Sequence, residues 1–383
     1  MKVPFFRLKL TQSEARAVQK VVRSGWLTTG PAVAEFETGL ARLVGARHAV
    51  ALSSGSAGLH LTLAALGIGP GDEVITTPFT MAATLEAILY CGATPILADI
   101  DPVTLNIDPA AVAKKVGRRT RAILTVDIAG QPCDYRALKR LAREHRLYLI
   151  DDAAHALGAR YRGRSIGAVA DATIFSFYST KNITTGEGGA VVTPKKALAD
   201  RIRHLSLHGM TSSGWKRHHG GSWRYDITEL GHKYNMSDLN AGLGLGQLER
   251  FEAMQECRRR LAARYREKLA GFGEYIELPA DDDRVRSAWH LFIVKLQSDR
   301  WRVDRDRLID ELEKRGVGCG VHFIPVYHFS LFKKLLKCRA SDFPTCEAAF
   351  RRVITLPFYH DLTYREIDYV AAVFGRLIKQ FGK

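Results

Sequence analysis

Lys181 lies in a segment that could bring a reactive amine to a ligand. The run 175–190, FSFYSTKNITTGEGGA, ends a strand-like stretch in small and hydroxylated residues, continues to the lysine and then turns through glycines. Ligands of α/β proteins bind beyond the carboxyl ends of strands, where burial lowers the pKa of an amine below its usual value of about 10.4. A neutral amine can condense with a carbonyl group. A lysine after a strand is more often a solvated surface group, so this segment needs support from others.

Two carboxylates and an imidazole follow another strand-like run. The segment YLIDDAAHALG, residues 148–158, brings Asp151 and Asp152 to the end of an apolar stretch, with His155 three positions later. A buried carboxylate needs a partner, and beside a heterocyclic cofactor it would keep a ring nitrogen protonated through its opposite charge. The spacing leaves open which aspartate does so, and His155 could lie on one face of the ring. The alternative is structural: Asp152 caps a helix and His155 is a hydrogen-bonded core residue.

The segment LSSGSAGLHL, residues 52–61, is suited to bind a phosphate. A strand end and a serine–glycine turn lead directly into an apolar helical pattern. The amides of Gly55, Ser56 and Ala57 would lie at a helix amino terminus, where unpaired N–H groups and the helix dipole attract an anion. Ser176, ahead of the lysine, could donate another hydrogen bond. Serine capping of a helix without any ligand explains the same pattern equally well.

The elements that must position these residues alternate along the first two thirds of the chain. Apolar runs separated by amphipathic helical stretches such as 134–145 predict a mostly parallel sheet covered by helices, an α/β fold. The strand-like runs are 48–52, 73–76, 94–99, 121–126, 147–151 and 172–177. A long helical pattern at 237–269, followed by strand-like runs at 291–296 and 317–323, predicts a smaller α+β domain. We therefore expect a large domain at 1–249 and a small C-terminal domain at 250–383.

Lys181, Asp152 and Gly55 each follow a predicted parallel strand, so their segments would meet at one edge of the sheet and contact one ligand. With these motifs the chain resembles, nearly end to end, the DegT/DnrJ/EryC1/StrS family of sugar aminotransferases, which depend on pyridoxal 5'-phosphate (PLP). The resemblance implies an aspartate-aminotransferase-like fold (PLP fold type I). The motifs that carry it are SGWLTTGP (24–31), SSGSAGLHL (53–61), GDEVITTPFT (71–80), DDAAHA (151–156), FSFYSTKNITTGEGG (175–189), GHKYNMSDLNA (231–241) and AWHLF (288–292).

The resemblance implies a complete cofactor site. Lys181 is implied as the lysine that bonds covalently to PLP, Asp152 as the partner of the ring nitrogen and His155 as a group stacked on the ring. Met81 occupies the place where relatives commonly carry an aromatic ring against the cofactor, and a thioether can pack there as well. The residues implied to hold the phosphate are Gly55, Ser56, Ala57 and Ser176.

The resemblance also implies a partner subunit and a substrate side. Asn235, within KYN, would reach the cofactor phosphate of a neighbouring subunit, which implies a homodimer with shared active sites. The residues on segments implied to line the substrate side are Trp26, Thr28 and His322. Among the branches of the family, KNIT, GEGG and AWHLF look most similar to UDP-4-amino-4-deoxy-L-arabinose–oxoglutarate aminotransferase.

The reaction implied by this resemblance moves an amino group from glutamate to a nucleotide-linked keto sugar, with a 4-keto sugar as the main expectation. Such a step would serve cell-surface polysaccharide, lipid A (lipopolysaccharide) or amino-sugar biosynthesis. A 3-aminotransferase or a cyclitol aminotransferase of the same family is the alternative. Asp127 stands where relatives usually carry a histidine, and with Met81 it weakens the argument for the arabinose substrate.

Composition bounds the other function classes. A formal net charge of +16 admits a non-catalytic regulator or a nucleic-acid binder, but the basic residues alternate with acids, so we expect solvated faces and no nucleic acid. Lys181 argues against the PLP-dependent sugar dehydratases of this family, which carry histidine there. His204 and His208 are spaced like zinc ligands without a third ligand, so we expect no metal. Scattered cysteines and the lack of a long apolar run predict a cytoplasmic protein without membrane insertion.

Overall fold

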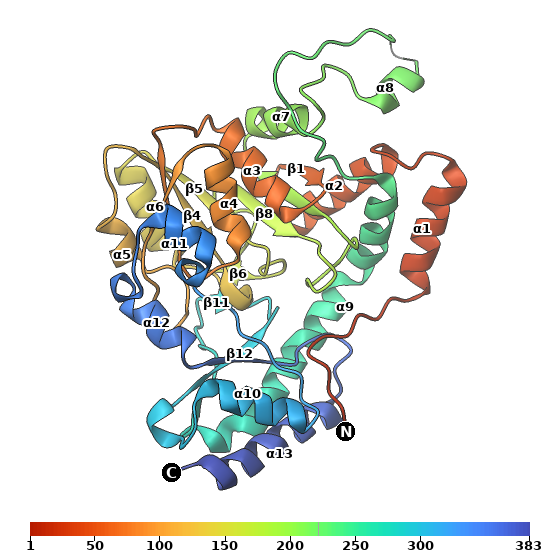
Figure 1. Cartoon of the computed structure of the whole chain (residues 1–383). Helices are drawn as coiled ribbons and strands as arrows, with labels where there is room; N and C mark the ends of the chain where they lie inside the picture. Colours follow the sequence, from red (N-terminus) through yellow and green to blue (C-terminus); the bar gives the residue numbers. More distant parts are fainter. Residues whose placement is uncertain (221) are drawn as a thin grey trace.

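The central element of the computed structural model, which describes residues 1–220 and 222–383, is a seven-stranded sheet (Figure 1). All of its strands run parallel except β9, which is antiparallel to both neighbours. The spatial order is β1 (His48–Leu52), β9 (Gly189–Thr193), β8 (Ala172–Ser176), β5 (Tyr148–Asp152), β4 (Thr120–Val126), β2 (Glu73–Thr76) and β3 (Thr94–Leu97). The predicted α/β fold is confirmed, and the six strands expected from the sequence all belong to this sheet.

Both faces of the sheet are buried, because successive side chains of a strand point to opposite faces. In β1, Ala49 and Ala51 belong to one buried cluster, whereas Val50 and Leu52 belong to another. The first cluster includes residues of α2 (Pro31–Val44), α5 (Pro109–Ala113), α6 (Tyr135–Glu144) and α9 (Asp238–Leu269). The second includes residues of α3 (Gly55–Ala65), α4 (Ala82–Tyr90) and α7 (Lys196–Leu205). The strand ends are therefore held between two layers of helices.

Helix α9 packs closely against α1 (Gln12–Ser24) because its contact face carries glycines. A methyl group on Gly246 would lie 2.8 Å from the Cα atom of Glu14, closer than two carbons can approach. Farther along the same helix, Leu261 and Tyr265 belong to the buried cluster of the C-terminal region. The predicted domain boundary at 249/250 thus falls inside an unbroken helix, and the division into two domains stays a prediction.

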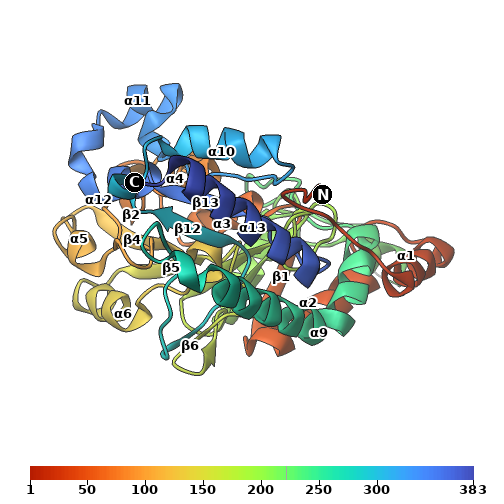
Figure 2. The same ribbon diagram turned by 90° about the horizontal axis from the view of Figure 1, so that it is seen from below.

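The C-terminal region combines helices with a small sheet beside the second half of α9. Figure 2 shows α13 running next to α9, and the two helices are in contact. The sheet is antiparallel, in the order β10 (Ile276–Glu277), β12 (Phe292–Leu296) and β13 (Val353–Leu356). The helices are α10 (Arg305–Lys314), α11 (Ser330–Leu336), α12 (Pro344–Phe350) and α13 (Tyr364–Phe381). This region matches the smaller α+β unit expected from the sequence.

The strand predicted at 317–323 is absent, so that prediction was wrong. The segment makes only isolated β-bridges, one of them between Val317 and Val3. A methyl group on Gly318 would lie 2.6 Å from the backbone nitrogen of Phe5. The absence of a side chain at Gly318 therefore lets the N-terminal segment lie directly against this part of the chain. Val3 donates to the Gly316 carbonyl at 2.7 Å and accepts from the Gly318 amide at 2.9 Å, and the pairing ends after this one bridge.

The polar, glycine-rich sequence of residues 212–224 predicts a loop. The described part of this segment contains the short helix α8 (Gly214–His218) and projects from the body of the molecule (Figure 1). Gly221, part of that prediction, lies outside the described residues. A third small sheet joins β11 (Val285–Arg286), β6 (Arg160–Tyr161) and β7 (Arg164–Ser165). Within the ranges that the structure describes, no helix combines the length and the apolar character that crossing a bilayer requires.

Candidate active site

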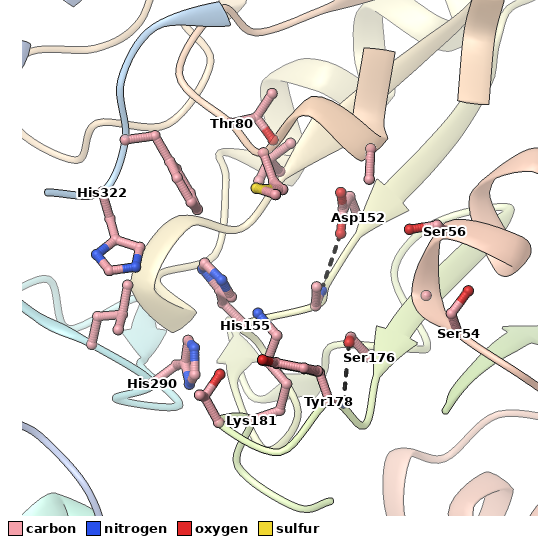
Figure 3. Close-up of a pocket in the computed structure, with 18 of the residues that line it drawn as sticks. Ser54, Ser56, Thr80, Asp152, His155, Ser176, Tyr178, Lys181, His290 and His322 are labelled. Carbon is pink, nitrogen blue, oxygen red and sulfur yellow. Dashed lines mark hydrogen bonds between the residues drawn. The ribbon is translucent and has the colours of Figure 1, made fainter. Parts of the chain in front are cut away.

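A pocket with a volume of about 480 Å³ lies where the carboxyl ends of β1, β5 and β8 face the C-terminal region. Figure 3 shows imidazoles on one side of it and serine hydroxyls on the other, with the side chain of Lys181 between the two groups. The predicted site residues that line the pocket are Gly55, Ser56, Met81, Asp152, His155, Ser176, Lys181 and His322. Its apolar wall includes Phe5, Phe6, Leu291, Phe323, Leu356 and Phe358. The three segments singled out in the sequence therefore meet at one cavity.

Lys181 is carried by the connection between β8 and β9, at the sheet edge where the pocket opens. Its backbone N–H donates to the carbonyl of Tyr178 at 2.9 Å, which closes a tight turn and directs the side chain inward. Burial lowers the pKa of the Lys181 amine to about 8, and the negative charge of Asp152 opposes this shift only in part. A substantial fraction of the amine is consequently neutral near physiological pH.

The alternation of side chains along β5 separates the two aspartates. Asp152 lines the pocket, whereas Asp151 points to the opposite face, where Thr125 Oγ1 donates to it at 3.4 Å. Asp152 Oδ2 accepts a hydrogen bond from Thr84 Oγ1 at 2.9 Å, and Oδ1 accepts one from the backbone N–H of Ala154 at 3.2 Å. Burial still raises the pKa of Asp152, although both hydrogen bonds and Lys181 lower it. The carboxylate would be stabilised by a cation placed beside it.

His155 is held in a defined orientation above the end of β5. Its ring is stacked on that of Phe323, with 5.7 Å between centroids and 19° between planes, and His290 lies 4.4 Å away. The backbone N–H of Ala129 donates to His155 Nδ1 at 3.3 Å, so the proton of the neutral ring is on Nε2. Burial lowers the pKa of His155 well below its usual value, which keeps the ring uncharged.

The amino terminus of α3 forms the hydroxyl-rich end of the pocket. Ser54 caps the helix, its Oγ accepting the backbone N–H of Ala57 at 3.0 Å, so this amide already has a partner and Ala57 does not line the pocket. The amides of Gly55 and Ser56 lie nearer the pocket opening. A methyl group on Gly55 would lie 3.1 Å from Ser176 Cβ, so glycine lets the end of β8 approach the start of the helix. The space in front of these groups suits an anion.

Besides Ala57, three of the predicted residues lie outside the pocket of the single chain. Trp26 packs edge-on against Trp215 of α8, with 4.9 Å between ring centroids. The carbonyl of Thr28 accepts the backbone N–H of Asp238 at 3.3 Å. Asn235 donates from Nδ2 to the hydroxyl of Thr29 at 2.6 Å. Their roles, like those of the residues that do line the cavity, stay predictions.

Several lining residues were not singled out in the sequence. Ser54 belongs to the motif SSGSAGLHL and directly precedes a helical pattern, a position that is typical of a helix-capping residue. His290 stood inside AWHLF, but its approach to Lys181 depends on contacts between segments more than a hundred positions apart. The remaining polar ones are Thr80, Tyr178, Thr180 and Glu187.

The residues present fit PLP. Asp152 is a buried carboxylate for a protonated ring nitrogen, and Lys181 is the only lysine or arginine among the described lining residues. The close approach of Gly55 to Ser176 leaves a hydroxyl-lined cradle at a helix amino terminus, which suits the phosphate. The rings of His155 and Phe323 both line the pocket and provide flat faces against which a cofactor ring can pack.

A family model and several known proteins match nearly the whole chain. The model of the DegT/DnrJ/EryC1/StrS aminotransferase family matches residues 9–374. The spore coat polysaccharide biosynthesis protein SpsC of Bacillus subtilis is 42% identical over 379 residues, 98% of this chain and 97% of that protein. The putative sugar aminotransferase Spr1654 from Streptococcus pneumoniae, in its pyridoxamine phosphate (PMP) form, superimposes with a TM-score of 0.92 at 33% identity. The match covers 99% of this chain and 98% of the Spr1654 chain. DesI, whose structure was determined in the presence of its TDP-sugar product, superimposes with a TM-score of 0.88 at 33% identity. The match covers 98% of this chain and 92% of the DesI chain.

These likenesses extend over nearly the full length of each protein, and Spr1654 has been solved with both the PLP and the PMP form of the cofactor. They are consistent with the pocket itself, where the amine of Lys181, the carboxylate of Asp152 and the amino terminus of α3 meet. The chain therefore belongs to the DegT/DnrJ/EryC1/StrS aminotransferase family and is a PLP-dependent aminotransferase of the sugar-aminating kind.

Proposed function

We propose that this aminotransferase transfers the amino group of glutamate to the keto group of a nucleotide-linked 4-keto sugar, in the synthesis of a cell-surface polysaccharide. The observation that carries the proposal is the Lys181 amine, whose pKa is lowered to about 8 by burial while Asp152 lies close enough to interact with its charge. The polysaccharide role of SpsC and the TDP-sugar product of DesI support this choice of substrate.

When bound, PLP supplies an aldehyde that bonds to amines and a protonated ring that withdraws electrons from the bond to be broken. Asp152 would hold the proton on the ring nitrogen through its negative charge, and Thr84 keeps that carboxylate oriented. His155 would cover one face of the ring as a neutral group. The groups that would bind the phosphate are the amides of Gly55 and Ser56 and the hydroxyls of Ser54, Ser56 and Ser176.

Lys181 is the group that would move the proton. A partly neutral amine can accept the proton from the α carbon of glutamate, and as an ammonium it can deliver a proton to the sugar carbon that carried the keto oxygen. A pKa near the working pH suits both directions, because neither protonation state is strongly favoured. The apolar wall that includes Phe5 and Phe323 would exclude water from this transfer.

A second subunit would complete the site. Glutamate and a nucleotide diphosphate bring several negative charges, yet the described residues that line the pocket include no arginine and no lysine besides Lys181. The projecting segment around α8 contains Arg217 and Arg224, and Leu230 nearby is 95% exposed. We infer a homodimer in which this basic segment and Asn235 of one subunit reach the pocket of the other.

Two further predictions belong to this proposal. We infer that 1–249 binds the cofactor and that 250–383 forms a C-terminal domain that supplies part of the substrate wall, as the position of His322 in the pocket suggests.

A cytoplasmic location agrees with six cysteines that are all free in the structure. Limited proteolysis and cell fractionation would examine the two points separately.

The proposal is tested first by the cofactor bond. Purified protein incubated with PLP should show a visible-violet absorbance band, and a peptide map after borohydride reduction should find the adduct on Lys181. The Lys181→Ala variant should lack the band and turn over no substrate. Colourless protein, or an adduct on another side chain, would refute the assignment, and tight binding of duplex DNA by such protein would favour the regulator class instead.

The substrate is tested by single half-reactions. The PMP form is mixed with nucleotide-linked 4-keto sugars, 3-keto sugars and keto cyclitols, and loss of PMP absorbance identifies the acceptor. We expect loss with a 4-keto sugar. Consumption of only a 3-keto sugar or a cyclitol would replace the proposed substrate by the corresponding alternative while leaving the aminotransferase assignment intact.

A further inference from the structure

Asn182, the residue after the reactive lysine, is buried in a network of side-chain and backbone hydrogen bonds. Its Nδ2 group donates to the carbonyls of Ala288 at 2.9 Å and Leu157 at 3.4 Å, and to Gln255 Oε1 at 3.3 Å. Its Oδ1 lies 3.1 Å from His290 Nδ1. Asn182 thus connects the lysine turn to the AWHLF segment and to α9.

These contacts fix which end of the Asn182 amide faces His290. All three partners of Nδ2 are oxygens that accept, and Gln255 uses its own Nε2 to donate to the Ala288 carbonyl at 2.8 Å. The reverse orientation would place Oδ1 against three oxygens that cannot donate to it, and Leu157 and Gln255 would lose the hydrogen bond from Asn182. Since Oδ1 can only accept, the hydrogen of the His290 ring must be on Nδ1, and Nε2 carries the lone pair.

His290 presents this lone pair to the pocket that it lines. Within the described part of the chain, its Nε2 has no hydrogen-bond partner. Burial lowers the pKa of His290 well below its usual value, so the ring stays neutral with one bare nitrogen. The backbone of the same segment is held by Arg258, which donates to the carbonyl of Trp289 at 3.1 Å. The neighbouring His155 has the opposite tautomer, with its hydrogen on Nε2.

We infer that Asn182 is a positioning residue that fixes His290 as the Nδ1–H tautomer, and that His290 Nε2 accepts a hydrogen bond from a ring hydroxyl of the sugar substrate. The inference rests on the proposed sugar substrate. Carboxylates, phosphates and keto oxygens are all acceptors, so a bare nitrogen repels them, whereas the hydroxyls of a sugar are donors. His290 therefore favours binding of a keto sugar that carries hydroxyl groups and disfavours binding of the carboxylates of glutamate at the same position.

The tautomer is measured first, in protein without cofactor. Long-range ¹H–¹⁵N spectra of deuterated, histidine-labelled protein are assigned with the His290→Gln variant. We expect a protonated Nδ1 and an unprotonated Nε2 whose shifts do not change with pH. The Asn182→Leu variant, similar in volume but unable to accept, should give a mixture of tautomers. A wild-type spectrum with the hydrogen on Nε2 would overturn the inference, whether or not the variant folds.

The substrate contact is measured in the two half-reactions. With the PMP form and a dTDP-linked 4-keto-6-deoxyhexose, His290→Phe should lower kcat/KM on the order of 10-fold more than it lowers the glutamate half-reaction, because only the sugar loses a hydrogen bond. His290→Gln, which restores an acceptor oxygen, should recover most of the loss. The exposed His145 supplies the control variant His145→Phe.

The two proposals fail in different ways. If wild-type protein consumes none of the keto sugars, the proposed function fails, while the NMR result still decides the tautomer. If the sugar is consumed and His290→Phe affects both half-reactions equally, the hydroxyl contact is wrong and the proposed function stands.

Discussion

Asp127 and Asp151 are neighbouring buried carboxyls at the ends of the parallel strands β4 and β5, and in the described ranges neither forms an ion pair. Asp127 Oδ1 accepts from the Tyr135 hydroxyl at 2.9 Å and from the Cys133 amide at 2.8 Å. The Oδ2 atoms of both aspartates are buried without a hydrogen-bond partner among those residues. Burial raises the pKa of Asp127 to about 7, and burial together with Asp127 raises the pKa of Asp151 well above its usual value. The pair therefore retains a proton near neutral pH.

This pair makes the stability of the fold depend on pH. An acid whose folded pKa is raised binds more protons in the folded state, so the free energy of unfolding falls as pH rises from about 4 towards 7. Asp127→Asn should remove the part of that dependence that comes from Asp127 and raise stability above pH 7, by an amount on the order of a few kcal/mol. Urea unfolding at several pH values measures the free energy of unfolding and its dependence on pH. The exposed Asp283→Asn should behave as wild type, and an unchanged pH profile in Asp127→Asn would contradict the shared proton.

The hydrogen bond from Thr84 to Asp152 Oδ2 should control the charge of that carboxylate. Thr84→Val removes the donor, which raises the pKa of Asp152 further and should reduce turnover on the order of 10-fold. The acidic limb of the activity profile should move to higher pH, because more alkaline conditions are then needed to ionise Asp152. Thr84→Ser, which keeps the hydroxyl, is the control. Equal loss of activity at every pH would indicate a packing defect instead.

The contact between Gly55 and Ser176 should be required for cofactor binding. A methyl group at Gly55 meets Ser176 Cβ at 3.1 Å, and the larger side chain in Gly55→Val must displace it. We expect affinity for PLP to fall about 10-fold or more, while thermal unfolding of the cofactor-free protein changes little. Equilibrium dialysis gives the affinity. Gly271→Ala, where an added methyl group meets nothing within 4 Å, should bind PLP as wild type does.

The glycine face of α9 should matter for folding. In Gly246→Val the side chain would collide with the backbone of Glu14, 2.8 Å from the first added carbon. Overpacking of this kind typically costs about 1–3 kcal/mol, more than any gain from replacing glycine in a helix. Urea unfolding should show the loss with the cofactor absent. A variant as stable as wild type would mean that α1 can move away without cost.

The sequence predicted the strands and the pocket-lining segments because these features are local. Apolar runs located β1, β5 and β8, and the polar residues at or after the ends of these strands included Gly55, Asp152 and Lys181. The sequence could not decide between the two aspartates, since the answer depends on which face of β5 each side chain takes.

Features that depend on distant contacts were not predicted. Thr84 reaches Asp152 from a separate helix, and His290 is oriented by Asn182 across more than a hundred positions. The strand expected at 317–323 is absent for a similar reason, because apolar periodicity does not reveal that this segment meets its neighbours only at single bridges, Val317 with Val3 and Gly320 with Thr355. Each case requires knowledge of which segments become neighbours in space.

The unbroken course of α9 limits how the pocket can change shape. The same helix carries Gly246 against α1 and, a few turns later, Gln255 and Arg258 that hold the segment bearing His290. Because α9 is helical through 249/250, no loop there can act as a hinge. The C-terminal residues that line the pocket can therefore approach the strand ends only if α9 tilts or slides as a rigid helix. Opening and closing of the active site would accordingly be coupled to the packing of α1 against α9, far from any reacting atom.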